Sequence, residues 1–68
     1  MVQALKNRIK DLRAQQGLTQ ADLAVKVMVS RKTINTIENE VFMPSALLAF
    51  RLARALGTGV EDLFYLED

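Results

Sequence analysis

The side chains with the most distinctive chemistry lie between residues 30 and 36 of this 68-residue chain. Arg31, Lys32 and Asn35 follow Ser30 at spacings that predict one outward face of a helix capped by the serine. Arginine can bind guanine through O6 and N7, asparagine can bind adenine through N6 and N7, and lysine can pair with phosphate. The group therefore suits a nucleic-acid duplex. A solvated surface is the alternative interpretation for Arg31 and Lys32.

The rest of the composition argues against catalysis. The chain contains neither histidine nor cysteine, which excludes disulfides, thiol nucleophiles, zinc sites with the usual ligands and any triad that needs an imidazole. It has no glycine-rich phosphate loop, and the carboxylates Glu61 and Asp62 fall at a predicted helix start, where the helix dipole explains them. We therefore expect no enzyme, no cofactor, no metal site and no small-molecule ligand.

Charge is unevenly distributed along the chain, although the net charge is only +1. Residues 1–54 hold nine basic and four acidic residues, a difference of +5, whereas the last fourteen residues hold four acids and no base. Such polarity suits a protein that turns one face toward phosphate. At this length one core can form, so we expect a single domain over residues 1–68. Met1 to Lys10 has no apolar run, so we expect neither a signal peptide nor a membrane span.

Helical periodicity runs through the chain. Leu5, Ile9 and Leu12 recur at spacings of four and three, which predicts a first amphipathic helix ending near Gln16, with Gly17 in the left-handed C-terminal conformation. No alternation of apolar and polar residues with a period of two, as in a β-strand, competes with this pattern. The first helix should therefore carry one apolar face toward the core.

The next two predicted helices are short and closely spaced. Thr19 and Asp22 form a capping-box pattern that begins a second helix of about eight residues, and Ser30 caps a third. Only two or three residues separate the two helices, so they must cross steeply. Their predicted buried positions are Leu23, Ala24, Val27, Ile34 and Ile37.

Two further helices complete the prediction. Ser45 caps a fourth helix that runs to about Leu56 and is ended by Gly57. A fifth helix runs from Val60 to about Leu66. The pattern is therefore all-α.

The stretch from Leu18 to Ser45 resembles the helix-turn-helix of the Cro and phage-repressor family, also called the XRE family. The matching pieces are Leu18-Thr19-Gln20, Leu23-Ala24, Val29-Ser30-Arg31-Lys32-Thr33-Ile34, Ile37-Glu38-Asn39 and Pro44-Ser45. The resemblance implies a compact five-helix, lambda-repressor-like DNA-binding domain with its helix-turn-helix at the second and third helices. It also implies a sequence-specific transcriptional regulator, most often a repressor, that is cytoplasmic and associated with the nucleoid through a double-stranded DNA operator.

The same resemblance suggests which residues contact DNA. The third helix would enter the major groove. Gln20 would touch the DNA backbone and buttress the recognition residue, and Asn39 would contact phosphate, with a plain helix C-cap as the equal alternative for Asn39. The expected DNA-binding residues are Gln20, Ser30, Arg31, Lys32, Thr33, Asn35, Thr36 and Asn39.

Other features of the resemblance concern structure. Arg13 and Glu38 resemble a buried or half-buried ion pair that ties the first helix to the third. Met28 and Glu40 replace glycines of the family pattern, and the site of Met28 commonly needs a positive φ, which costs a non-glycine residue roughly 1 to 2 kcal/mol. The apolar stretch from Val41 to Met43 replaces a more polar loop, which weakens the expected phosphate contacts there.

Apolar side chains outside the predicted core suggest an interface. We therefore expect a homodimer formed by the fourth helix, the loop before it and the C-terminal segment. The side chains that suggest it are Leu47, Val41, Phe42, Met43, Tyr65 and Leu66. This dimer would place two recognition helices about 34 Å apart on a palindromic site. Core packing is the alternative for Phe42 and Leu66. The alternative function is a protein-interaction module, such as an antitoxin or a helical adaptor.

Overall fold

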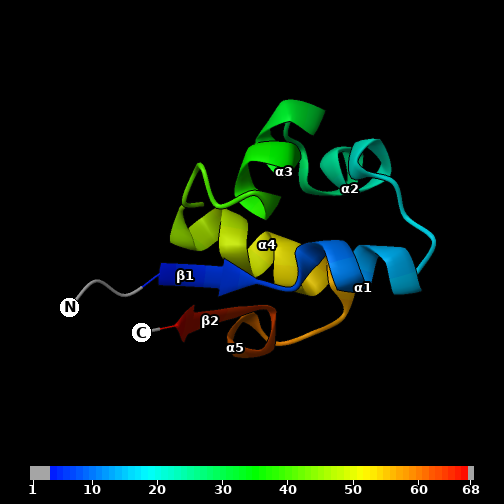
Figure 1. Ribbon diagram of the computed structural model, residues 1–68. Helices are drawn as coiled ribbons and strands as arrows, with labels where there is room; N and C mark the ends of the chain where they lie inside the picture. The colour runs from blue at the N-terminus through cyan, green and yellow to red at the C-terminus, as the bar shows by residue number, and fades with distance from the viewer. Residues whose placement is uncertain (1–3, 68) are drawn as a thin grey trace.

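Five helices and one small sheet make up residues 4–67, the part of the chain that the computed structural model describes (Figure 1). The elements are β1 (Ala4–Asn7), α1 (Ile9–Gln15), α2 (Gln20–Val27), α3 (Arg31–Glu38), α4 (Ala46–Leu56), α5 (Val60–Leu63) and β2 (Phe64–Glu67). The predicted five-helix fold, with its helix-turn-helix at α2 and α3, is confirmed. No helix within residues 4–67 is both long and apolar enough to cross a bilayer.

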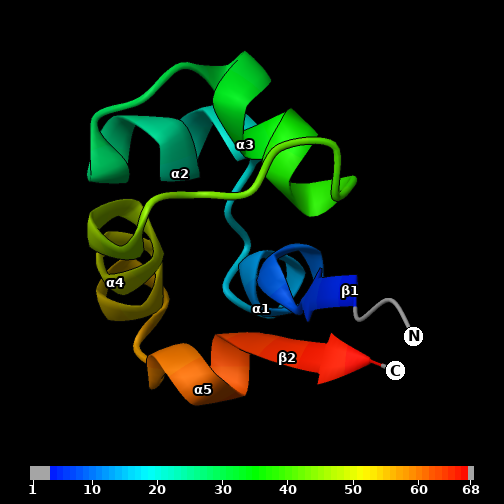
Figure 2. The same ribbon diagram turned by 90° about the vertical axis from the view of Figure 1, so that its left-hand side faces the viewer.

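The core is apolar and draws side chains from all five helices. Each fully buried leucine or isoleucine stabilises the fold by about 1.5–3 kcal/mol relative to an exposed one. The buried residues are Ile9, Leu23, Ala24, Val27, Ile34, Ile37, Leu52, Ala53, Leu56 and Leu63. In Figures 1 and 2, α2 and α3 lie at one end of the molecule, and α5 and β2 lie at the other. The core therefore fixes the helix-turn-helix at a free end of the domain.

Serine and threonine caps start the helices where the sequence predicts them. The Thr19 hydroxyl accepts a hydrogen bond from the Asp22 N–H at 3.0 Å, and the Asp22 carboxylate accepts one from the Thr19 N–H at 3.0 Å. This second bond lowers the pKa of Asp22 below its ordinary 3.8. Ser30 and Ser45 cap α3 and α4 in the same way, through their hydroxyls. The predicted starts of these three helices are confirmed.

The first and last predicted helices are partly wrong. Leu5 lies in β1 rather than in a helix, and α1 begins at Ile9. The last helix ends at Leu63, so the segment to Glu67 is a strand. The two strands pair antiparallel from Ala4 opposite Glu67, and this pairing of distant segments overrides the local helical periodicity. The domain is therefore mainly helical with one small sheet.

The two positions that replace family glycines both adopt the left-handed conformation. Met28, which ends α2, has φ 61°, and Glu40, just after α3, has φ 63°. The chain thus keeps the turn geometry and tolerates the backbone strain that a side chain brings. Gly17 and Gly57, both at φ 70°, end α1 and α4 as predicted.

Candidate nucleic-acid interface

The start of α3 is open to solvent and carries free positive charge. Ser30 caps the helix, and both Arg31 and Lys32 are exposed. Among residues 4–67 neither cation forms a hydrogen bond or an ion pair. The acidic residues of α5, Glu61 and Asp62, belong to the opposite end of the domain (Figures 1 and 2). This geometry leaves the two cations available to an anionic partner.

An ion pair holds the far end of α3 against α1. Arg13 Nε donates to Glu38 Oε2 at 2.8 Å, and Arg13 Nη2 donates to Glu38 Oε1 at 3.2 Å. The two side chains are only 14% and 5% exposed. The hydrogen bond to Glu38 raises the pKa of Arg13 above its usual value. The ion pair expected from the sequence is therefore present, and a third bond, from Nη1 to the Leu18 carbonyl at 3.0 Å, fixes the guanidinium further.

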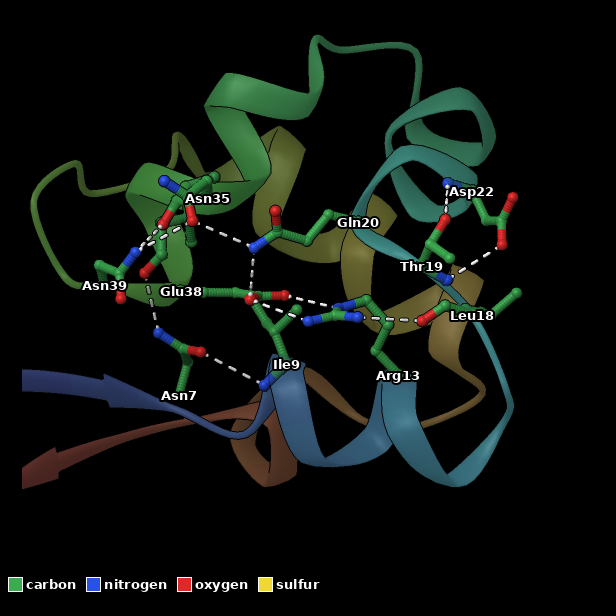
Figure 3. Close-up of polar contacts among 11 residues, drawn as sticks. Asn7, Ile9, Arg13, Leu18, Thr19, Gln20, Asp22, Asn35, Glu38 and Asn39 are labelled. Carbon is green, nitrogen blue, oxygen red and sulfur yellow. Dashed lines mark hydrogen bonds and ion pairs between the residues drawn. The ribbon is translucent and has the colours of Figure 1, made fainter.

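A chain of amide hydrogen bonds continues from this ion pair to the exposed face of α3 (Figure 3). Gln20 Nε2 donates to Glu38 Oε1 at 3.0 Å and to Asn35 Oδ1 at 3.1 Å. From the other side, Asn39 Nδ2 donates to the Asn35 carbonyl at 2.9 Å and to Asn35 Oδ1 at 3.1 Å. Of the expected DNA-binding residues, Gln20, Asn35 and Asn39 are thus joined in one network.

The network limits what Gln20 and Asn39 can offer to a phosphate. Both N–H groups of the Gln20 amide face acceptors of the protein, so its side chain has only an oxygen left for another partner. Asn39 caps the end of α3 and also donates back into the helix. Both residues are therefore placed to support Asn35. A phosphate near Gln20 would meet the backbone N–H groups at the start of α2 instead.

The expected hydroxyl residues are used within α3 itself. Ser30 Oγ accepts from the Thr33 N–H at 3.1 Å and lies 2.9 Å from Thr33 Oγ1. Thr36 Oγ1 donates to the Thr33 carbonyl at 3.0 Å. Thr33 and Thr36 are partly buried. These contacts give the three hydroxyls a local role in shaping the helix surface beside Arg31 and Lys32.

Two residues of β1 that sequence reasoning missed contact the end of α3 and Glu40 beyond it. Asn7 Nδ2, at the end of β1, donates to the Ile37 carbonyl at 3.0 Å, and Asn7 Oδ1 accepts from the Ile9 N–H at 3.2 Å. Lys6 pairs with Glu40 at 3.0 Å, and this hydrogen bond raises the pKa of Lys6. Both contacts were missed because the sequence pattern predicts a helix where β1 lies. An asparagine just before a helix could have indicated the hydrogen bond that Asn7 accepts from the Ile9 N–H.

The loop between α3 and α4 borders the same surface. Val41 and Phe42 line a shallow groove together with Lys32, Thr33 and Thr36. Both apolar side chains are largely exposed. The structure thus places an apolar edge beside the exposed face of α3. Within residues 4–67 no cluster of acidic side chains is arranged to hold a metal ion.

This chain is similar both to a family model and to individual proteins of known sequence. A family model described as helix-turn-helix matches residues 9–63. An uncharacterized HTH-type transcriptional regulator of Methanocaldococcus jannaschii is 48% identical over 64 residues, which covers 94% of this chain and 97% of that protein. The uncharacterized HTH-type transcriptional regulator YgzD of Bacillus subtilis is 41% identical over 64 residues, which covers 94% of this chain and 97% of that protein.

Solved structures show the same fold. The restriction-modification controller protein C.AhdI from Aeromonas hydrophila superposes with a TM-score of 0.79 at 30% identity, covering 84% of this chain and 86% of that one. The master regulator for biofilm formation SinR, solved in complex with DNA, superposes with a TM-score of 0.72 at 28% identity, covering 78% and 86%.

Proposed function

The chain belongs to the XRE-type helix-turn-helix family of DNA-binding transcriptional regulators, and we propose that it recognises a specific operator by placing α3 in the major groove. The observation that carries this proposal is that Arg31 and Lys32 are exposed and have no ion-pair partner within residues 4–67. They lie at the capped start of a helix whose other end is fixed by Glu38. A rigid helix with free cations at its open end suits the edge of a duplex.

Each side chain then has a distinct task. Arg31 contacts a base edge, and Lys32 contacts phosphate or a base beside it. The start of α2 at Gln20 binds phosphate through its backbone N–H groups. Asn35 faces the bases from the middle of the exposed face. Ser30, Thr33, Thr36 and Asn39 complete the surface that lies against the DNA.

SinR, which was solved in complex with DNA, shares this fold at 28% identity. The names of the sequence relatives describe transcriptional regulators. These likenesses support a DNA partner here rather than a catalytic activity. Occupying an operator near a promoter would block RNA polymerase, so repression is the expected effect.

The apolar surface supports a homodimer. Seven of the nine large apolar side chains that the described residues expose belong to α4, the loop before it or β2. They are Val41, Phe42, Met43, Leu47, Phe50, Tyr65 and Leu66. The loop packs near the sheet, because Phe42, Met43 and Phe64 line one groove. A two-fold dimer through this surface would present two α3 helices to half-sites about 34 Å apart.

A protein-interaction module is the second candidate, because the same apolar surface could bind a different protein. Replacing Arg31, Lys32 and Asn35 together by alanine separates the two functions. If α3 recognises DNA, the triple variant keeps its helical circular dichroism and loses operator binding by at least about a hundredfold. Unchanged duplex binding by the folded variant would overturn the proposal in favour of the interaction module.

A further inference from the structure

The oxygen of the Asn35 carboxamide is fully used within the protein. It accepts one hydrogen bond from Gln20 Nε2 at 3.1 Å and a second from Asn39 Nδ2 at 3.1 Å. An amide oxygen has two lone pairs, so both are taken. Among residues 4–67 the Asn35 amide nitrogen donates no hydrogen bond, and the residue is exposed. The Asn35 side chain can therefore present two N–H donors and no acceptor to a partner molecule.

The donor and acceptor roles in these hydrogen bonds are fixed, because neighbouring groups can only donate or only accept. Glu38 is bonded to Arg13, which can only donate, and its carboxylate can only accept from Gln20. This sets the nitrogen of Gln20 toward α3. On the other side, Asn39 must place its nitrogen toward the Asn35 carbonyl.

Turning over the Asn35 amide would therefore be costly. Its NH2 group would then face the NH2 groups of Gln20 and Asn39, with two hydrogen bonds lost. Each of those neighbours is held by a second acceptor, Glu38 or the Asn35 carbonyl, so neither can turn over to compensate. Within the protein, the amide of Asn35 is thus held in one orientation.

We propose that Asn35 acts as a fixed hydrogen-bond donor that selects guanine in the operator, an inference that rests on the DNA-binding function proposed above. Guanine presents two acceptors, N7 and O6, in the major groove, and thymine presents only O4. Adenine places an N6 donor beside N7, and cytosine presents only a donor. The bidentate adenine pair that asparagine usually forms needs the oxygen that Gln20 and Asn39 occupy, so adenine is disfavoured at this position.

Asn35→Asp tests the proposal because it replaces the outward NH2 group by an oxygen. The negative charge that it adds should weaken binding to every duplex alike, so the readout is the relative affinity among duplexes. A carboxylate still accepts from Gln20 and Asn39, but an oxygen replaces the free NH2 group. The experiment selects duplexes from a random pool with the wild-type protein and with Asn35→Ala. The base pair at which only the wild-type pool shows a preference is the Asn35-dependent base pair, and binding is then measured to four duplexes that differ only there. Wild-type protein should prefer guanine about tenfold over adenine, and Asn35→Asp should shift the preference to cytosine, whose N4 group donates.

Two further variants distinguish base recognition by Asn35 from a purely structural role of its side chain. Asn35→Ala should lose the preference at that base pair and gain no new one. Gln20→Ala combined with Asn39→Ala leaves Asn35 in place but frees its oxygen, so binding to the adenine duplex should rise at least about fivefold relative to guanine. Circular dichroism confirms that each variant is folded.

The outcomes are distinguishable. If the wild-type protein enriches no sequence at all, the proposed function fails and this inference fails with it. If it enriches a sequence but the Asn35-dependent base is adenine, or if Asn35→Asp and Asn35→Ala change no base preference, only the donor role of Asn35 is overturned. A guanine preference that inverts in Asn35→Asp supports the inference.

Discussion

Arg13 in α1 and Glu38 in the last turn of α3 form a forked ion pair, with its two N–O distances at 2.8 and 3.2 Å. They lie 25 residues apart in the sequence, so the contact joins two separate parts of the fold. The same Glu38 carboxylate also accepts from Gln20. One carboxylate therefore sets both the position of α3 on the domain and the orientation of the amides on its exposed face.

Removing Arg13 should destabilise the domain strongly. Arg13→Ala leaves the Glu38 carboxylate, only 5% exposed, without its countercharge, and breaking one side of such a pair typically costs about 3–5 kcal/mol. Urea unfolding should show this loss, or a chain that no longer folds. Lys10→Ala is the matched control, since Lys10 is an exposed cation of the same helix with no partner within residues 4–67, and its effect should stay within about 0.5 kcal/mol. Equal stabilities of the two variants would contradict the structural role of the pair.

Glycine at position 28 should stabilise the fold. Met28 has φ 61° at the end of α2 and is 73% exposed, so the substitution relieves backbone strain and loses little packing. We expect the free energy of unfolding of Met28→Gly to rise by about 1 kcal/mol, the strain relieved less the added entropy of the unfolded chain. Met28→Ala keeps the strain and should show no such gain. A destabilised glycine variant would show that the Met28 side chain contributes more than its exposure indicates.

Stability should fall in acid partly through Asp22. Its folded-state pKa is lowered by the hydrogen bond from the Thr19 backbone, so the unfolded chain binds the proton more readily. The stabilisation is present above the ordinary value of 3.8 and disappears as the pH falls through the lowered folded-state pKa. Asp22→Asn should therefore be less stable than the wild-type protein at neutral pH, and the gap should narrow in acid. Thermal unfolding across the acid range checks this, and a gap that does not depend on pH would refute it.

The apolar surface should govern self-association. Leu47 is 63% exposed on α4, and Leu47→Glu would bring a charge into the proposed dimer interface. Sedimentation velocity should find a wild-type dimer at micromolar concentration and a dissociation constant at least tenfold higher for Leu47→Glu, by roughly 1.4 kcal/mol or more. Val25→Glu is the control, because Val25 is an exposed apolar residue on α2, outside that surface. If wild-type protein sediments as a monomer well above micromolar concentration, the dimer is excluded.

Local signals in the sequence predicted much of this fold. Thr19, Ser30 and Ser45 act on N–H groups within three residues of themselves, so their caps can be recognised without knowing the tertiary structure. The buried positions of α2 and α3 likewise follow from helical spacing. The resemblance to a known family supplied the pairing of Arg13 with Glu38, which no local pattern contains.

The remainder depends on contacts between distant segments. Leu5 fits a helical period, yet it lies opposite Leu66 in a sheet, because strand pairing between the two ends of the chain has no local signature. The amide orientation of Asn35 is also beyond sequence reasoning. It depends on Gln20 from one helix and Asn39 from the end of another, each fixed by a further partner.

Parallel selection of duplexes from a random pool, with wild-type protein and with Arg31→Ala at one stated salt concentration, tests the central claim most directly. We expect the wild-type protein to enrich a defined sequence. Arg31→Ala should bind that sequence more weakly by roughly 1 to 3 kcal/mol and lose the preference at one base pair in each half-site. If the wild-type protein enriches nothing, or if Arg31→Ala returns the same sequence with the same affinity, then the start of α3 does not recognise DNA.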